Sequence, residues 1–334
     1  MHALRVTAFG GPAEANAAFE DLARPVPGPE QLVIEVHAVP VNFVDLITLR
    51  GDYQFKPELP YTPGKGPAGV VTAVGDSCDG WRPGDRVLGM AEYGGFAEQT
   101  LVNADNVYRL PPTMSFIEAA ALSLSMDTAW MALRERARIQ PGETVLVLGA
   151  AGAVGGAATR LARPMGAGKV LAGVSNAERS LLPAGVEIDG VVDLDLAEPR
   201  DSIREQVLDL TGGRGVDVVI DPLGGDYFLG ATRSLAWRGR LVVVGFASGS
   251  IPTFKANYVM LKNIEVSGLQ ISDYRKRMPE LVRAGYDEIF RFFEDGELTA
   301  PSTRVMPLGE WRDAMRALES RTARDRLVLV PDGR

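Results

Sequence analysis

A run of small residues from Gly149 to Gly155 is the part of this sequence whose residue types and spacing point most directly to chemistry. It follows the apolar run 145–148 and opens an alanine-rich segment at 154–165. Small side chains let a pyrophosphate approach the backbone, where a helix N-terminus offers unpaired N–H groups and the positive end of its dipole. Gly155 would let that helix pack closely on the preceding strand. A strand, a glycine-rich turn and a helix in this order predict a dinucleotide-binding fingerprint.

The spacing of this loop differs from the usual G-x-G-x-x-G, because Ala150 stands at the first glycine position, followed by Gly152 and Gly155. A tight turn with no ligand is the alternative interpretation. The context of strand and helix favours ligand binding, in which the backbone of Gly152, Ala153 and Val154 holds the cofactor phosphates.

The end of the next predicted strand, at Val174, Ser175 and Asn176, indicates which nicotinamide cofactor the loop would bind. NAD sites place an acidic residue here, about 20 residues after the glycines, on the ribose 2′-hydroxyl. This strand end has no carboxylate to repel a 2′-phosphate, and Arg179 lies close enough in the chain to pair with one. Ser175 and Arg179 therefore favour NADPH over NADH. The alternative is that Arg179 only solvates the start of a helix, with Glu178 weakening its field.

The cysteine and histidine content limits any metal site, because the chain has only Cys78, His2 and His37. A catalytic zinc needs about three protein ligands and a structural zinc about four, mostly from these residue types. A catalytic site would require all three, including the one at the chain terminus. We therefore expect no metal, and the single cysteine excludes a disulfide within the chain.

Short apolar runs broken by glycine and proline fill roughly the first 120 residues, a spacing that predicts a small, irregular, mostly antiparallel β-barrel. These runs lie at 32–39, 69–74, 86–90 and 96–102, and the N-terminal residues 1–10 also have the pattern of a strand. In the first of the listed runs His37 shares a face with Glu35, opposite the apolar side chains. His37 is therefore expected to face solvent rather than take part in catalysis.

A different pattern begins at Ser115, with an Ala- and Leu-rich helix predicted at 117–136 and then regular alternation of strands and helices. The strands are predicted at 144–148, 169–174, 190–193, 217–221, 240–245 and 264–269, with helices at 154–165 and 227–237. This alternation predicts an α/β fold with a doubly wound parallel sheet. A helical stretch at 274–295, an amphipathic helix carrying Trp311, Met315 and Leu318, and a last strand at 326–330 complete the chain.

Composition and charge narrow the class of partner. The 334 residues are 46% hydrophobic and 23% charged, with a net charge of −8 and no basic cluster. Nucleic acid and anionic membranes require a local cationic patch, so neither is expected as a partner. No apolar run approaches the roughly 18 residues of a membrane helix, and the N-terminus lacks the pattern of a signal peptide. A cytoplasmic location is the default expectation.

Matching segments along nearly the whole chain resemble the zinc-independent quinone oxidoreductases of the medium-chain dehydrogenase/reductase superfamily. The segments that carry this resemblance, beside the glycine loop, are Val41-Asn42-Phe43-Val44-Asp45, Pro63-Gly64, Ala68-Gly69-Val70-Val71, Gly84-Asp85-Arg86-Val87, Gly94-Gly95-Phe96-Ala97-Glu98, Thr128-Ala129, Pro141-Gly142-Glu143, Asp221-Pro222-Leu223-Gly224-Gly225 and Gly239-Arg240-Leu241-Val242. Their order and spacing make the resemblance specific, and the missing metal ligands select the zinc-free branch.

The resemblance implies a Rossmann dinucleotide-binding domain at 123–267 and a GroES-like, mainly β catalytic domain at 1–122 and 268–334. The cofactor, NADPH, would lie in the cleft between them, and a homodimer is the default assembly. Further positions carried over as cofactor-binding are Asn42, Thr128, Leu223, Gly245, Phe246, Ser248, Leu269 and Arg326. Asn42 and Thr128 would lie near the nicotinamide or the substrate, and Asp45 would support the Asn42 loop. Asn42 and Asp45 could equally form a helix N-cap pair.

The chain also departs from the family pattern at several positions. Ile47 stands where relatives carry a pocket Tyr, although Tyr53 is retained, and Leu194 replaces a Tyr that often packs near the 2′-phosphate. Lys65 follows Pro63-Gly64 at a position that is usually acidic or polar in the superfamily. The Leu194 replacement weakens the argument for NADPH.

Without a metal, the acceptor must be polarised by hydrogen-bond donors, and Tyr53 and Lys65 are the candidates. Tyr53 could instead cover the site as an amphipathic residue, and Lys65 could be an exposed turn residue. The resemblance implies hydride transfer from NADPH to a quinone or another conjugated carbonyl compound. The alternatives are an enoyl-thioester (CoA) reductase of the same superfamily, which should show a basic groove, and a protein that binds NADPH without catalysis.

Overall fold

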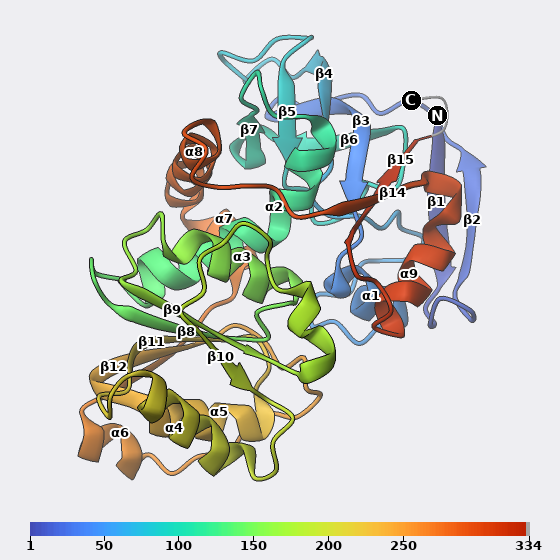
Figure 1. The fold of residues 1–334 in the computed structure, drawn as a ribbon. Helices are drawn as coiled ribbons and strands as arrows, with labels where there is room; N and C mark the ends of the chain where they lie inside the picture. The colour runs from blue at the N-terminus through green and yellow to red at the C-terminus, as the bar shows by residue number, and fades with distance from the viewer. Residues whose placement is uncertain (332–334) are drawn as a thin grey trace. The chain divides into compact units, whose positions relative to one another are not determined.

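In the computed structural model, which describes residues 1–331, the chain forms two compact units (Figure 1). One consists of residues 1–124 with the C-terminal segment from Ala300, and the other of residues 125–299. The expected fold class is confirmed, because the first unit is mainly β and the second is an α/β unit with a parallel sheet.

The first unit is built on a largely antiparallel sheet (Figure 1). β14 and β15 pair in parallel, whereas the other neighbours in this sheet are antiparallel. The strands lie in the order β14 (Thr303–Pro307), β15 (Arg326–Val330), β3 (Gln31–Pro40), β4 (Ala68–Val74), β5 (Arg86–Gly89) and β7 (Val107–Arg109), with β6 (Gln99–Asn103) also paired to β3. Separate from them are the pair β1 (His2–Ala8) and β2 (Asn16–Asp21), the helices α1 (Phe43–Arg50) and α9 (Trp311–Glu319), and short 3-10 turns at Ala104–Asn106 and Leu308–Glu310.

The amphipathic pattern near the C-terminus forms α9 as predicted. Trp311 and Met315 are buried in the core of the first unit, together with side chains of β1, β3 and β15, and Leu318 packs against the same core. Burying large apolar side chains is the main favourable term for such a helix. α9, near the C-terminus, therefore stabilises the same unit that the N-terminal strands form.

His37 lies on the predicted face of its strand but is only partly exposed to solvent. Its side chain is 27% exposed, its ring centroid lies 4.5 Å from that of Phe116, and its Nε2 lies 3.7 Å from the Glu35 carboxylate. The alternation of β3 correctly places His37 opposite the apolar face. It could not show that the first turn of α2 (Phe116–Trp130) covers part of that opposite face.

The second unit contains a six-stranded sheet in which every neighbouring pair is parallel. The order is β10 (Gly190–Asp193), β9 (Lys169–Val174), β8 (Thr144–Leu148), β11 (Val216–Asp221), β12 (Leu235–Val243) and β13 (Glu265–Gly268). From β8 the chain first adds strands on one side and then on the other. Such a switch point is where ligands bind in open α/β sheets, beyond the carboxyl ends of the strands.

Helices cover both faces of this sheet, with α3 on one face and α4 and α5 on the other (Figure 1). Besides the second half of α2, the unit contains a π-helical turn at Met131–Arg136, α3 (Ala153–Ala162), a 3-10 segment at Asn176–Leu181, α4 (Pro199–Leu210), α5 (Gly225–Ser234), α6 (Asn257–Lys262), α7 (Ile271–Arg277) and α8 (Pro279–Glu294). Three strands have the predicted bounds, β8, β9 and β10. The helix predicted at 227–237 ends at Ser234, because β12 already begins at Leu235.

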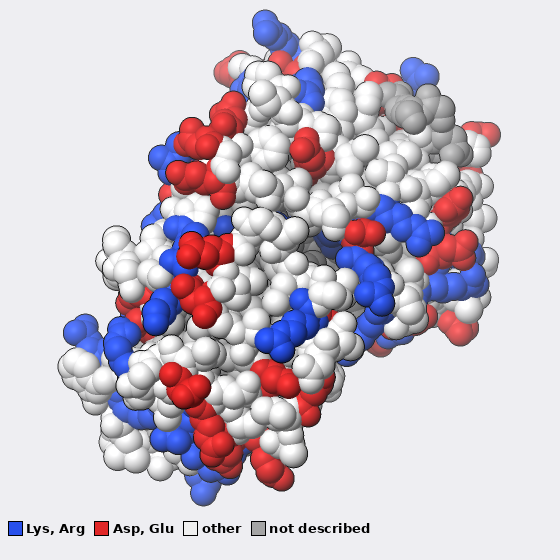
Figure 2. All heavy atoms as spheres, viewed as in Figure 1, with Lys and Arg blue, Asp and Glu red and all other residues white. Residues whose placement is uncertain are grey.

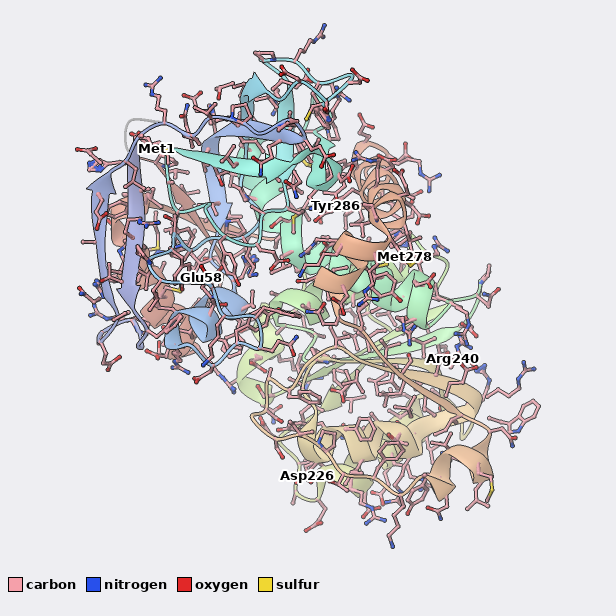
Figure 3. The ribbon with its side chains drawn as sticks, turned by 180° about the vertical axis from the view of Figure 1, so that it is seen from behind. Met1, Glu58, Asp226, Arg240, Met278 and Tyr286 are labelled. Atoms are coloured by element: carbon pink, nitrogen blue, oxygen red, sulfur yellow. The ribbon has the colours of Figure 1, made fainter. Side chains whose placement is uncertain are left out.

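The boundary between the units differs from the expected one, because residues 268–299 belong to the second unit. The reason is a set of contacts that hold α7 and α8 to the second half of α2. The Trp130 indole N–H donates to the Glu288 carboxylate at 2.6 Å, and Gly285 lies so close to the Trp130 ring that a Cβ there would be 2.9 Å from it. Figure 3 labels Met278, the residue that precedes α8, and Tyr286 on α8.

Candidate active site and cofactor site

Two glycines with positive φ fix the loop that carries Lys65. Gly64 has φ 99° and Gly66 has φ 74°, conformations that other residues rarely adopt. A Cβ at Gly64 would lie 2.5 Å from the Phe96 ring, and one at Gly66 would lie 2.6 Å from the Ser123 hydroxyl. The loop therefore packs tightly on both sides and turns the Lys65 side chain inward, where only 2% of it is exposed.

The Lys65 ammonium lies in a cage made by one carboxylate and two aromatic rings. Its Nζ forms an ion pair with the Glu92 carboxylate and lies 4.9 Å from the ring centroid of Tyr93 and 5.4 Å from that of Tyr53. Aromatic faces attract cations, and more strongly when the cation is removed from water. We call Tyr53, Lys65, Glu92 and Tyr93 the Lys65 cluster. The alternative of Lys65 as an exposed turn residue is wrong.

Asn42 joins three segments that are far apart in the sequence. As the N-cap of α1, its backbone N–H donates to Asp45 Oδ2 at 2.9 Å. Its side-chain Nδ2 donates to the Lys65 carbonyl at 3.3 Å, and its Oδ1 accepts from Arg326 Nη2 at 2.5 Å. Asp45 therefore has the helix-capping role that the sequence left open. Contact of Asn42 or Arg326 with a cofactor stays a prediction, and Arg326 is also tied to the Val41 carbonyl at 3.3 Å.

Burial dominates the electrostatics beneath the Lys65 cluster. It raises the pKa of Asp45 to about 6. The positive charges of Lys65 and Arg326 and the hydrogen bonds from Asn42 act in the opposite direction. Burial also lowers the pKa of Arg326 to about 10 and raises that of the Tyr93 phenol to about 12. Near neutral pH Arg326 therefore keeps its charge and the Tyr93 phenol keeps its proton.

The glycine loop of the second unit leaves the start of a helix exposed. Gly152 is the N-cap of α3, and Gly152 and Ala153 are exposed, as an approaching ligand requires. The first N–H groups of an α-helix have no partner within it, so those of Ala153 and Val154 are available to an anion. A Cβ at Gly155 would lie 2.0 Å from the Gly149 carbonyl oxygen. The close packing of helix on strand predicted for Gly155 is thus confirmed.

Four other predicted cofactor positions gather in the loops that follow β11 and β12. The N–H of Ser248 donates to the Leu223 carbonyl at 3.0 Å, and a Cβ at Gly224 would lie 2.8 Å from the Phe246 ring. The Leu223 side chain lies against Gly149. Gly245 lies on the same loop as Phe246, and Leu269 directly follows β13. These positions therefore share the carboxyl edge of the parallel sheet with the glycine loop.

A buried carboxyl, Asp221, holds the loop after β11. Its Oδ1 accepts from the N–H groups of Leu223 and Gly224, at 2.8 and 2.9 Å, and its Oδ2 has no hydrogen-bond partner. Burial raises its pKa to about 6. Sequence reasoning used this segment only as part of a family pattern. The available signal was an aspartate at the end of an apolar strand. Such a side chain commonly accepts from the backbone N–H groups two or three residues further on.

The end of β9 is not free of carboxylates, so that part of the cofactor argument is wrong. The Ser175 hydroxyl donates to the Glu178 carboxylate at 2.7 Å. The Asn176 backbone N–H donates to Asp195 at 2.7 Å and its side chain to Asp193 at 3.0 Å. Asp193 ends β10, the neighbouring strand, and Asp195 lies just beyond it, so neither could be placed here from the residues of β9 alone. Arg179 is exposed, as binding to a phosphate would require.

Thr128 is buried beside an ion pair that sequence reasoning missed. Its hydroxyl donates to Asp127 Oδ1 at 3.4 Å, and Asp127 Oδ2 accepts from Arg275 Nη2 at 2.5 Å and Nε at 3.1 Å. Asp127 and Arg275 are 1% and 4% exposed, and Tyr286 also hydrogen-bonds to Asp127. An aspartate inside an apolar helix was the signal available, since such a charge needs a buried partner.

Within residues 1–331, no group of three or more His, Cys, Asp or Glu side chains is arranged to hold a metal ion. The Cys78 thiol donates to the Pro29 carbonyl, and His2 lies 3.6 Å from the Asp21 carboxylate. Over the same residues the structure contains no helix with the length and apolar character needed to cross a membrane.

Comparison with known proteins gives consistent matches. Residues 28–112 match the family described as alcohol dehydrogenase GroES-like domain, and residues 153–285 match the zinc-binding dehydrogenase family. The quinone oxidoreductase-like protein 2 of Mus musculus is 36% identical, over 92% of this chain and 86% of its own length. Among solved structures, a mycobacterial protein complexed with NADPH is 31% identical (TM-score 0.87; 99% of this chain, 100% of the other). The CurK enoyl reductase is 28% identical (TM-score 0.84; 99% of each chain).

The raised pKa of Asp45 makes a prediction about stability and pH. The folded state keeps a proton on Asp45 that the unfolded chain loses, so ionisation lowers the free energy of unfolding as pH rises from about 4 to about 6. A pKa moved from 3.8 to about 6 corresponds to about 3 kcal/mol lost by neutral pH. Urea unfolding should therefore show that the free energy of unfolding of Asp45→Asn rises relative to that of wild type as pH rises. The relative gain should be about 3 kcal/mol between pH about 4 and neutral pH.

Asp313→Asn is the matched control, because that carboxylate is 69% exposed. Its unfolding free energy should follow the wild-type curve across the same pH range. Parallel curves for Asp45→Asn and wild type would contradict the assignment.

Proposed function

The chain belongs to the zinc-independent quinone oxidoreductase family of the medium-chain dehydrogenase/reductase superfamily, and on that premise we propose that it passes a hydride from NADPH to a small quinone or enone. The observation that carries the proposal is the buried Lys65 ammonium beside Tyr53, on a backbone whose Lys65 carbonyl accepts from the Asn42 side chain. A cation held out of water is a strong electrophilic partner for a carbonyl oxygen, because the low local dielectric strengthens its field.

The bound nicotinamide would supply the hydride, and that chemistry belongs to the cofactor. The protein supplies binding and polarisation. The N–H groups of Ala153 and Val154 at the start of α3 hold the pyrophosphate, and Leu223 and Phe246 line the loops at the same sheet edge. Lys65 and Tyr53 donate to the acceptor oxygen as negative charge develops there.

Selection of NADPH rests on Arg179 and is opposed by nearby carboxylates. The exposed Arg179 guanidinium is free to reach a 2′-phosphate with charge-assisted hydrogen bonds. Glu178 holds the Ser175 hydroxyl that would otherwise donate to the same phosphate, and Asp193 and Asp195 add negative charge at this strand end. We therefore propose a preference for NADPH that is modest, with NADH also accepted.

An enoyl-thioester reductase is the second candidate, favoured by the similarity to the CurK enoyl reductase. A CoA thioester would bring phosphates that need a cationic groove. On the face drawn in Figure 2, Lys and Arg side chains are interspersed with Asp and Glu. This mixed surface favours a small uncharged acceptor over a CoA thioester.

Oxidation of NADPH and NADH with a panel of quinones, simple enones and enoyl-CoA thioesters, with and without a chelator, tests the function. The expected result is chelator-resistant turnover of quinones or enones. Turnover confined to CoA thioesters would replace the proposal with the second candidate. Tight NADPH binding with no turnover of any acceptor would indicate a non-catalytic binding protein.

Fluorescence titration of NADPH and NADH tests the cofactor preference. Arg179→Ala should weaken NADPH binding by about tenfold and leave NADH binding unchanged, because a charge-assisted contact to the 2′-phosphate is worth about 1.5 kcal/mol. Glu178→Gln should tighten NADPH binding, since it removes a repulsive charge. Arg291→Ala, at an exposed arginine of α8, is the control. Equal loss of affinity for both cofactors in Arg179→Ala would overturn this assignment.

A further inference from the structure

Reduction of a conjugated carbonyl compound needs a proton as well as a hydride, and the site must recover that proton after each turnover. In the proposed function the Lys65 ammonium donates to the acceptor oxygen, but only 2% of its side chain is exposed. Once it gave up a proton, it would need a partner that reaches solvent.

Glu92 has the position that such a partner requires. Its carboxylate forms an ion pair with Lys65 Nζ, and 30% of its side chain is exposed. Two contacts hold the adjacent Tyr93 in place. Its hydroxyl donates to the Phe55 carbonyl at 2.7 Å, and its ring packs edge-on against that of Tyr61, with 5.7 Å between the centroids. The backbone that carries Glu92 is therefore anchored next to the ammonium.

The other titratable groups around Lys65 are poorer candidates. Asp45 is 2% exposed and its carboxylate accepts from the Asn42 N–H, so it does not reach water. Arg326 is half-buried, and its guanidinium is tied to Asn42 and Val41. The Tyr93 phenol holds its proton more tightly than a free phenol because burial raises its pKa, and the Tyr53 ring faces the ammonium at 5.4 Å. Of the carboxylates beside Lys65 in the described chain, Glu92 is the one that joins the ammonium to solvent.

We propose that Glu92 is the proton inlet of the active site, an inference that rests on the proposed function. Hydride addition reduces the acceptor by two electrons and leaves an enolate or hydroquinone anion, while the nicotinamide is oxidised by two electrons. An N–H bond of Lys65 breaks as the O–H bond of the product forms. A solvent proton then adds to the Glu92 carboxylate, and the resulting carboxyl group passes it to the Lys65 amine, which restores the ion pair.

The relay predicts a particular time course when its inlet is removed. Glu92→Gln keeps the size of the side chain and an oxygen that accepts from Lys65, but its amide does not carry protons. The first turnover uses the proton already on Lys65 and stays within about twofold of wild type, whereas later turnovers fall by about tenfold or more. Rapid mixing of the full-length protein with NADPH and a quinone should therefore show a burst of one cofactor oxidised per site, followed by a slow phase.

Two further measurements separate the relay from a structural ion pair. The slow phase of Glu92→Gln should be slower still in D2O, and formate should restore the steady rate of Glu92→Ala, since a small acid can carry the proton into the vacated space. Glu319→Gln is the matched control, because Glu319 pairs with Arg50 in the same unit and is 36% exposed. It should show neither a burst nor rescue.

A steady rate in Glu92→Gln equal to that of wild type would overturn the relay. So would an equal loss of the first and later turnovers, which is the behaviour of a group that only positions Lys65. Both results leave the proposed function intact, because wild type still oxidises NADPH with a quinone. If wild type oxidises NADPH with no acceptor at all, the proposed function fails and the relay fails with it.

Discussion

Holding the Lys65 ammonium out of water is the constraint on which the first unit depends. Removing such a charge from solvent costs on the order of several kcal/mol unless partners surround it. Glu92 supplies the opposite charge, and the Tyr53 and Tyr93 rings supply polarisable faces. A charge stabilised in this way keeps a strong field, because little water is present to screen it. The same environment that is costly for folding is the one that the proposed polarisation of a carbonyl group requires.

The backbone around this charge comes from three distant parts of the chain. The loop after β3, the loop before β4 and the last strand, β15, meet at the Asn42 side chain. In the second unit the candidate site uses backbone groups instead of charged side chains. The start of α3 offers N–H groups, and the absence of a Cβ at Gly155 lets the helix pack closely on the preceding loop. One unit thus holds a charge with side chains, and the other leaves backbone N–H groups open at the start of a helix.

The fold was largely predictable because its signals are local. The alternation of apolar strands with helices, and the glycine loop between two of them, depend on neighbouring residues. The missed features are contacts between segments far apart in sequence: Arg275 beside Asp127, Asp193 and Asp195 beside Asn176, and the α2 helix over His37. Lys65 shows the difference most clearly, since a lysine between two glycines has the composition of an exposed turn. Only the packing of Gly64 on Phe96 and of Gly66 on Ser123 turns it inward.

The central claim is that the buried Lys65 charge polarises the hydride acceptor. A single-turnover measurement of NADPH oxidation by a quinone, with wild type and Lys65→Met at saturating cofactor, tests it most directly. The account predicts that the rate of hydride transfer falls by about a hundredfold or more, as expected for loss of one preorganised electrostatic contact, while the Kd for NADPH stays within about twofold of wild type. A hydride-transfer rate in Lys65→Met equal to that of wild type would contradict it.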